Sequence, residues 1–358
     1  MTNPKLRSDL IGRTPYGAPQ LDVEVKLNVN ENPFAPSEQL INAISEAVTT
    51  AVRDLNRYPD RDAIELRKDL AQYISGESEC EVSWENIWPA NGSNEVMHHL
   101  LQAFGGPGRR LVTFGPTYSM YPDYCRETFT EYVEVPRKEN FSIDSGLIQE
   151  ALRLSPDIIV LCSPNNPSGT VLEPDLLDEI VASFPGLLII DEAYAEFRDA
   201  GQPSSLKKYA GHSTVVVTRT MSKAFSCAGL RLGYAVAHPN IVSACQLVRL
   251  PYHLSAVTQA VARAALAHSA ELLGQVSLLK QERDSLLNWF IEHGFLVTPT
   301  GANFILFGKF ADRDSVWKQL LSHGVLIRQS GPEGWLRVSI GTPTENEKFR
   351  KALLSIDL

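Results

Sequence analysis

Residues 187–194 read LLIIDEAY, a run of four aliphatic residues that ends in two carboxylates. Comparable apolar runs alternate with helix-like stretches between residues 83 and 236; they lie at 111–114, 158–162, 215–218 and 234–237. Short runs without alternating polar residues are typical of strands buried on both faces, as in a parallel sheet covered by helices. The sequence therefore predicts an α/β fold whose large domain has a mainly parallel sheet between helices.

A second, smaller α+β domain is expected after Pro251, where the pattern changes. A long helical pattern covers residues 254–289, and short apolar runs follow it at 303–307, 325–328 and 336–340. The first residues are rich in Pro, Asn and Gly and show neither the apolar period of a helix nor that of a strand, which indicates an extended arm. The predicted divisions are an N-terminal arm at 1–34, a large domain at 35–250, and a small domain at 251–358 that packs with the arm.

The composition excludes several classes of partner. The 358 residues include 33 Lys and Arg against 42 Asp and Glu, a net charge of -9 that is spread along the chain. Nucleic acids and anionic membranes are bound by basic patches, so neither is an expected partner. The five cysteines are odd in number and include no C-x-x-C pair, so neither a disulfide framework nor a metal site is expected. Without a signal-peptide-like start or an aliphatic run that could cross a bilayer, a cytoplasmic protein is expected.

Four polar features lie where a strand ends or a helix begins, at the edge of the sheet where open α/β folds bind ligands. The first is Asp191, which follows the aliphatic run at 187–190. A carboxylate at the tip of a buried strand is costly without a partner. Asp191 is therefore a candidate ligand group, and an ordinary helix N-cap is the alternative.

Two further features are turns. Asn91-Gly92-Ser93-Asn94-Glu95 precedes a helix-like stretch at 96–104. Free backbone N–H groups at the start of a helix form an anion site, although an ordinary N-cap has the same appearance. Residues 162–169 read CSPNNPSG, with two asparagines between two prolines. Such a rigid loop can direct an amide at a ligand, but it also resembles a simple strand-to-helix turn.

The fourth feature is Lys223 in the segment TMSKAF, which is followed by Arg231 between glycines. A lysine surrounded by Ser, Phe, Cys and Ala is poorly solvated, which lowers its pKa and frees the amine to attack a carbonyl. A lone buried lysine is more often structural. Together with Asp191 and the anion-binding turn, Lys223 provides what pyridoxal phosphate requires: an amine for a Schiff base, a carboxylate for the pyridine nitrogen and a phosphate site.

The sequence resembles the fold-type I pyridoxal-phosphate aminotransferases and, within them, the histidinol-phosphate aminotransferase group. The matching segments extend over nearly the whole chain: YGAP at 16–19, NENP at 30–33, NRYP at 56–59, SK at 222–223, GLR at 229–231 and LRV at 336–338. The resemblance implies catalytic roles for Lys223, which carries the cofactor, for Asp191, which keeps the pyridine nitrogen protonated, and for Tyr194. It implies cofactor contacts by Gly92, Ser93, Asn94, Ser222 and Arg231 at the phosphate, by Asn166 and Tyr194 at the phenolic oxygen, and by Tyr118, which stacks on the ring.

The resemblance also implies a homodimer in which Tyr58 reaches the cofactor phosphate of the partner subunit. Arg337 is similar to the arginine that receives the carboxylate of amino-acid substrates, with Arg328 and Tyr16 as further substrate contacts. Histidinol phosphate has no α-carboxylate, so the same cationic pocket would accept its phosphate in one half-reaction and glutamate in the other. The small molecules implied are histidinol phosphate and 2-oxoglutarate, with imidazole acetol phosphate and glutamate as products.

Other functions share these motifs. Aromatic-amino-acid aminotransferases and a phosphothreonine decarboxylase have similar lysine and aspartate motifs, and which bond breaks depends on angstrom-scale geometry at the α-carbon that a sequence does not give. The arm motifs and RLPY at 249–252 favour the histidinol-phosphate group. A non-catalytic sensor would carry a separate basic helix-turn-helix region, whereas only a short arm is expected before the large domain.

Overall fold

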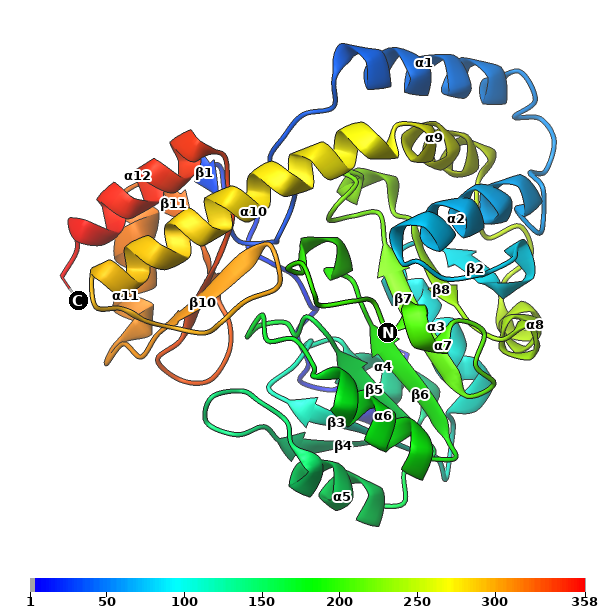
Figure 1. Cartoon of the computed structure of the whole chain (residues 1–358), viewed down its shortest axis with the longest axis horizontal. Helices are drawn as coiled ribbons and strands as arrows, with labels where there is room; N and C mark the ends of the chain where they lie inside the picture. Colours follow the sequence, from blue (N-terminus) through cyan, green and yellow to red (C-terminus); the bar gives the residue numbers. More distant parts are fainter. Residues whose placement is uncertain (1–3, 358) are drawn as a thin grey trace.

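The computed structural model describes residues 4–357, and a seven-stranded sheet forms its centre (Figure 1). The strand order is β2-β8-β7-β6-β5-β3-β4. The strands are β2 (Ile87–Ala90), β3 (Arg110–Gly115), β4 (Glu131–Pro136), β5 (Ile158–Cys162), β6 (Leu187–Asp191), β7 (Val215–Thr220) and β8 (Gly233–Val236). Strands β3 to β7 are parallel, and β8 is antiparallel to its neighbours β7 and β2. The predicted mainly parallel sheet is confirmed.

Helices cover both faces of this sheet (Figure 1). The helices up to residue 250 are α1 (Glu38–Val52), α2 (Ile64–Glu77), α3 (Ser93–Phe104), α4 (Tyr121–Thr128), α5 (Ser145–Arg153), α6 (Pro174–Ser183), α7 (Leu206–Tyr209) and α8 (Pro239–Val248). Short 3-10 helices are η1 (Ser8–Leu10), η2 (Trp84–Asn86), η3 (Ala195–Phe197) and η4 (Ala228–Leu230).

Alternate side chains of each central strand enter two different hydrophobic cores. On β6, Leu188 and Ile190 pack in the core that includes α5 and α6. Leu187 and Ile189 pack in the core that includes α3, α4 and α8. Because both faces are dry, the strands need apolar residues at every position, which explains the uninterrupted runs in the sequence.

The C-terminal part forms a second sheet, with the order β12-β13-β10-β9 and antiparallel pairing throughout. Its elements are α9 (Ala256–Ala267), α10 (Ser269–Glu292), β9 (Leu296–Val297), β10 (Phe304–Gly308), α11 (Arg313–Ser322), β11 (Val325–Leu326), β12 (Arg328–Gln329), β13 (Leu336–Ser339) and α12 (Pro343–Leu354). The long helix α10 runs from α9 beside the large sheet to the second sheet (Figure 1). The boundaries between the predicted domains stay a prediction.

Two expected elements are divided. The helical pattern at 254–289 forms α9 and α10, because His268 leaves helical geometry with φ -109° and ψ 22°. The run at 325–328 forms β11 and β12, which belong to different sheets. β11 pairs with β1 (Val25–Lys26) of the arm, whereas β12 pairs with β13. The run at 325–328 therefore breaks where its pairing partner changes from β1 of the distant arm to the neighbouring β13.

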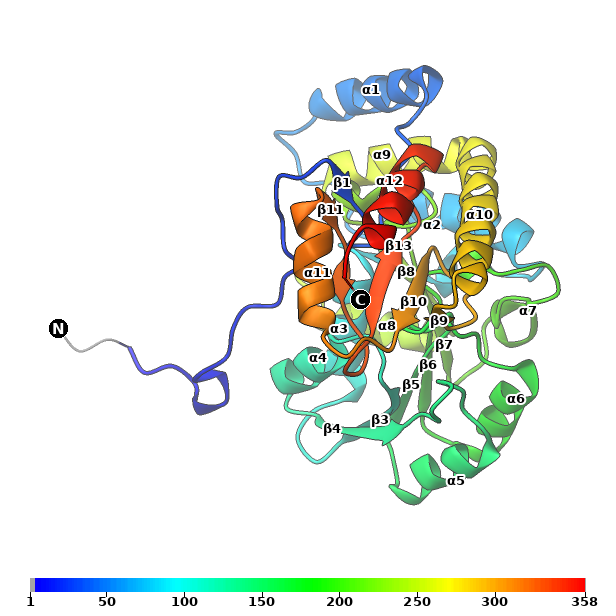
Figure 2. The same ribbon diagram turned by 90° about the vertical axis from the view of Figure 1, so that its left-hand side faces the viewer.

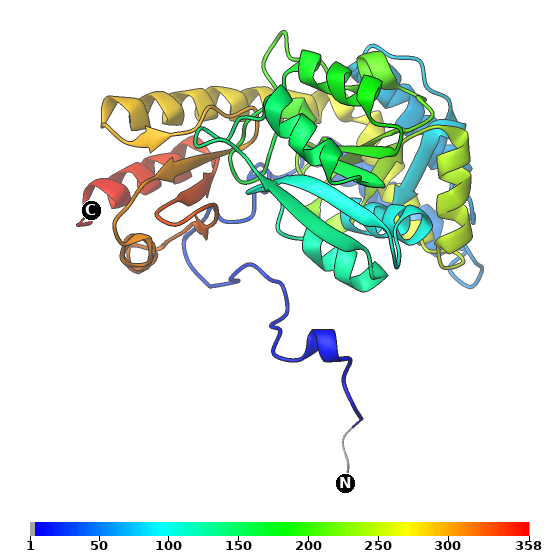
Figure 3. The same cartoon turned by 90° about the horizontal axis from the view of Figure 1, so that it is seen from below.

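The N-terminal arm begins away from the body and reaches it near β1 (Figures 2 and 3). Its parallel pairing with β11 places residues 25–30 beside the second sheet. Leu27 and Ser339 extend this contact through a backbone hydrogen bond of 2.9 Å. Of the helices within residues 4–357, none combines the length and the apolar character that crossing a membrane requires.

Candidate active site

A cavity of about 640 Å³ opens at the carboxyl ends of β3, β5, β6 and β7. The loops after these strands form one wall, and β12, β13 and the arm form the other. This is the position in which open α/β sheets bind ligands, because side chains from several strand ends converge there. All predicted site residues except Gly92 and Tyr58 line the cavity.

Asp191 is the last residue of β6, and its carboxylate is buried in the cavity wall. Tyr121 donates a hydrogen bond of 2.8 Å to one oxygen, and Thr218 donates one of 3.2 Å to the other. Burial raises the pKa of Asp191, and the two hydroxyl donors oppose the rise. A carboxylate fixed in this way is complementary to a protonated ring nitrogen, which would replace the water that it has lost.

Lys223 lies three residues after β7 and directs its amine into the cavity. Its Nζ donates to the backbone oxygen of Val29 in the arm at 2.8 Å. Burial lowers the pKa of Lys223 to about 8, and repulsion by Arg337 acts in the same direction. An amine with this pKa has an appreciable unprotonated fraction near neutral pH, and it can therefore attack a carbonyl.

The start of α3 forms a concave anion site. Gly92 precedes the helix with φ 86°, a conformation that favours glycine. A Cβ atom on Gly92 would lie 2.9 Å from Arg231 Nη2, and one on Gly233 would lie 2.2 Å from the backbone nitrogen of Ser93. Arg231 also approaches the hydroxyl of Ser222. Backbone N–H groups at a helix start, two serine hydroxyls and a guanidinium form a cradle that fits a phosphate.

A chain of polar contacts connects Tyr194 with Arg337. The Tyr194 hydroxyl accepts from Asn30 Nδ2 at 3.0 Å and from Asn166 Nδ2 at 3.4 Å. Asn166 Oδ1 accepts in turn from Arg337, which also donates to the backbone oxygen of Asn28 at 3.0 Å. Burial raises the pKa of Tyr194 to about 12 although Arg337 opposes this. The hydroxyl therefore keeps its proton, which it can donate to a ligand oxygen.

Arg337 is a buried cation without a counter-ion among the residues that the structure describes. Its guanidinium lies over the ring of Phe304 at 5.1 Å, and within residues 4–357 its Nε has no hydrogen-bond partner. Burial lowers the pKa of Arg337. Since a buried charge is costly unless it is paired, this end of the cavity is complementary to an anionic group. Arg328 and Tyr16 line the same cavity.

The two other predicted aromatic residues have different positions. Tyr118 lines the cavity, and its hydroxyl lies 3.3 Å from Asn94 Oδ1. Tyr58 is 80% exposed and stacks on Tyr252 with 4.3 Å between the ring centroids. Within one chain, the structure does not bring Tyr58 to the cavity.

Three residues of the site were not among those predicted from the sequence. Thr218 and Tyr121 hold the Asp191 carboxylate, and Asn30 contacts Tyr194. The sequence carried a sign of Thr218, because the hydroxyls of Thr218 and Thr220 alternate with Arg219 directly after the apolar run 215–217. Asn30 belongs to the NENP segment, whereas the sequence of α4 carries no sign that Tyr121 faces Asp191.

The side chains fit pyridoxal phosphate. The cradle at Gly92 and Gly233 leaves no room for a Cβ, and it lies in the same cavity as the Lys223 amine and the Asp191 carboxylate. Phosphate, aldehyde and pyridine nitrogen each have a chemically suitable group. The fold and this site define a pyridoxal-phosphate-dependent aminotransferase of fold type I.

Known proteins agree with this class. Residues 22–353 match the family "Aminotransferase class I and II". The chain is 52% identical over 351 residues to a histidinol-phosphate aminotransferase of Thermobifida fusca, which covers 98% of this chain and 95% of that protein. It is 51% identical over 352 residues to histidinol-phosphate aminotransferase 3 of Burkholderia lata, with the same coverage. The chain belongs to the class I and II aminotransferases and, within them, to the histidinol-phosphate aminotransferase group.

Solved structures show the same fold. A putative histidinol-phosphate aminotransferase from Erwinia carotovora atroseptica superposes with a TM-score of 0.82 at 26% identity, over 94% of this chain and 98% of that chain. The histidinol-phosphate aminotransferase of Sinorhizobium meliloti, in complex with pyridoxal-5'-phosphate, superposes with a TM-score of 0.85 at 23% identity. The match covers 97% of this chain and 96% of that chain. The fold class, the aminotransferase activity and the cofactor expected from the sequence are confirmed.

Proposed function

We propose that this enzyme transfers the amino group of histidinol phosphate to 2-oxoglutarate, which yields imidazole acetol phosphate and glutamate. The observation that carries this proposal is the buried Arg337, a cation that lacks a carboxylate partner within residues 4–357. The two amino compounds of this reaction each present an anion that this cation can pair with: histidinol phosphate its phosphate, and glutamate a carboxylate. The names of the relatives at about half identity support the same substrate.

Lys223 and Asp191 divide the work at the reacting centre in this proposal. When bound, pyridoxal phosphate supplies a ring that withdraws electrons from the substrate α-carbon. Asp191 holds the proton on the pyridine nitrogen by its charge, and Tyr121 and Thr218 keep that carboxylate in place. Lys223 would hold the cofactor through its amine, and the same Nζ would take up and return the proton of the substrate α-carbon.

The remaining cavity residues bind and orient. We assign the phosphate of the cofactor to Gly92, Ser93, Asn94, Ser222 and Arg231. Tyr194 and Asn166 donate to the phenolic oxygen, and Tyr118 stacks on the ring. Because Asn166 also contacts Arg337, substrate binding and cofactor orientation share one hydrogen-bonded chain. Arg328 and Tyr16 complete the substrate pocket.

A comparison of histidinol phosphate with histidinol tests the substrate. Purified enzyme is supplied with 2-oxoglutarate and with histidinol phosphate, histidinol or phenylalanine as the donor, and kcat/KM is measured for each. Loss of a charge-assisted contact of about 1.5–3 kcal/mol predicts that histidinol is at least tenfold worse than its phosphate. Equal efficiency for histidinol and its phosphate, or a higher one for phenylalanine, would instead identify an aromatic-amino-acid aminotransferase.

We also propose a homodimer in which Tyr58 completes the site of the partner subunit. Its support is an exposed apolar surface: Tyr58 and Tyr252 stack on each other, and Leu247 and Leu250 are 86% and 76% exposed. A stack of exposed aromatic rings outside the cavity is typical of an interface.

Subunit complementation tests the shared site. Chains with Lys223→Ala and chains with Tyr58→Ala are co-expressed with different tags, and the mixed dimer is isolated. If Tyr58 acts across the interface, one site of this dimer carries both defects and the other carries none. The mixed dimer should then regain about half of wild-type activity, more than either parent. An active monomer, or a mixed dimer no better than its parents, contradicts the proposal.

A further inference from the structure

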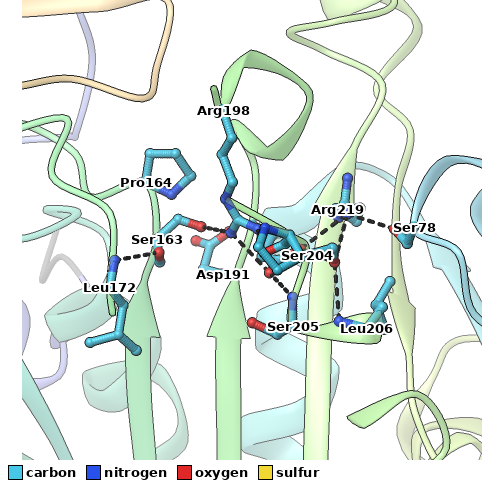
Figure 4. Close-up of polar contacts among 12 residues, drawn as sticks. Ser78, Ser163, Pro164, Leu172, Asp191, Arg198, Ser204, Ser205, Leu206 and Arg219 are labelled. Carbon is cyan, nitrogen blue, oxygen red and sulfur yellow. Dashed lines mark hydrogen bonds and ion pairs between the residues drawn. The ribbon is translucent and has the colours of Figure 1, made fainter. Parts of the chain in front are cut away.

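A cluster of buried charges lies at the carboxyl ends of β5, β6 and β7 (Figure 4). At its centre, the fully buried carboxylate of Glu192 lies 2.9 Å from Arg198 Nη2 and 3.0 Å from Arg219 Nη2. It also accepts from the Ser204 hydroxyl at 2.7 Å and from the Ser205 backbone N–H at 2.8 Å. These donors satisfy the buried carboxylate, although none of these five residues lines the cavity.

The cluster is connected with the active site through the alternation of side chains along β6 and β7. Asp191 and Thr218 are paired in the parallel register, and their side chains are hydrogen-bonded to each other. The next residue on each strand end points to the opposite face, where Glu192 pairs with Arg219. The backbone N–H of Glu192 donates to Thr218 O at 2.9 Å and continues the ladder. Contacts on the two faces thus fix the same pair of strand ends.

Arg198 extends this connection to β5. Its Nη2 donates to the backbone oxygen of Ser163, the first residue after β5, as well as to Glu192. Ser163 donates its own N–H to Asp191 O at 2.9 Å, and it leads into the loop that carries Asn166. One carboxylate with two arginines therefore ties together the ends of β5, β6 and β7.

The charges of the cluster favour an ionised Glu192. Burial opposes ionisation, but Arg198 and Arg219 outweigh it and lower the pKa of Glu192 to about 2. Arg219 also approaches Glu196 at 3.1 Å and Glu77 at 3.2 Å. Burial raises the pKa of Glu196 to about 7, although Arg219 opposes the rise. Glu192 is therefore the carboxylate that stays ionised beside both arginines near neutral pH.

We propose that Glu192 is a positioning residue for the cofactor site: with Arg198 and Arg219 it holds the ends of β5, β6 and β7 at the spacing at which Asn166, Asp191 and Lys223 meet the cofactor. This inference rests on the proposed cofactor contacts. It assigns a function to a residue that touches neither cofactor nor substrate. Small shifts of a supporting residue are enough to lose binding, because the groups that it supports must be placed within a fraction of an ångström.

The test compares Glu192→Gln with Glu196→Gln. Both variants replace a buried carboxyl group that contacts Arg219, but only the first disturbs Arg198 and the end of β5. Apoenzyme is titrated with pyridoxal phosphate to give Kd, and Tm is measured with and without the cofactor. Glu192→Gln should weaken cofactor binding about tenfold or more. It should also reduce the rise in Tm that the cofactor causes, whereas Glu196→Gln should leave Kd within about twofold of wild type.

A merely structural role gives a different result, since it lowers Tm equally with and without cofactor and leaves Kd unchanged. That outcome, or an equal loss of affinity in both variants, overturns the inference. If Glu192→Gln does not fold, Arg198→Lys decides by the same titration. Lysine keeps the charge but not the planar guanidinium, whose Nη2 contacts Ser163 and Glu192 while Nη1 donates to the backbone oxygen of Pro203 at 3.1 Å. Arg198→Lys should therefore weaken binding about threefold or more; wild-type affinity overturns the proposal. Wild-type enzyme whose Tm does not rise with cofactor would instead refute the cofactor site itself.

Discussion

Arg337→Ala is the sharpest test of the substrate pocket. The change removes a buried guanidinium whose Nη atoms donate to Asn166 and Asn28 and whose Nε has no partner within residues 4–357. A charge-assisted hydrogen bond contributes about 1.5–3 kcal/mol, which corresponds to roughly 10- to 140-fold in kcat/KM at about 1.4 kcal/mol per tenfold. Histidinol phosphate and glutamate should lose efficiency by similar factors, because each pairs its anion with this one cation.

Histidinol provides the control that separates substrate binding from general damage. It lacks the phosphate, so Arg337→Ala should reduce its kcat/KM much less than that of histidinol phosphate. The ratio of the two losses is the coupling between the arginine and the phosphate. Arg337→Lys should restore only part of the efficiency, since an ammonium does not reproduce the planar fork. Equal losses for histidinol and histidinol phosphate would show that Arg337 acts through Asn166 alone and would refute the assignment.

Three more predictions concern the cofactor. Lys223→Ala should abolish transamination in a folded protein that still binds the cofactor noncovalently. In wild-type apoenzyme the rate of cofactor attachment should rise with pH through about 8, the pKa of Lys223, and level off above it as the amine loses its proton; stopped-flow absorbance measures both. Asp191→Asn should reduce kcat about a hundredfold or more while Tm stays near that of wild type, because an amide cannot hold the ring proton by charge. A kcat within a few-fold of wild type would show that Asp191 does not face the ring nitrogen. Gly233→Ala should weaken cofactor binding about tenfold or more, since the new Cβ would lie 2.2 Å from the backbone nitrogen of Ser93 and displace the phosphate cradle; an equilibrium titration with wild-type Kd would argue against the cradle.

The sequence by itself determined the strands of the large sheet and the cavity residues that follow them. The run at 158–162 is the observed β5, and the run at 187–190 lies within β6. These predictions succeed because a strand buried on both faces must be apolar at every position, which is a local property of the chain. Lys223 and Asp191 could be identified from the sequence for a related reason. A charged residue at the end of such a strand is costly without a partner, so it is a candidate for a functional group.

Only the tertiary structure decided which charged and polar groups become partners. Thr218 meets Asp191 because β6 and β7 are neighbours in the sheet, and Arg337 meets Asn166 because β13 faces the loop after β5. The order of strands in a sheet is not a local property, since it depends on how all helices and strands share two cores. The same reason hides the ion cluster at Glu192: its carboxylate and its arginines look like ordinary surface charges until the strand ends bring them together, and in the fold they hold those ends in place.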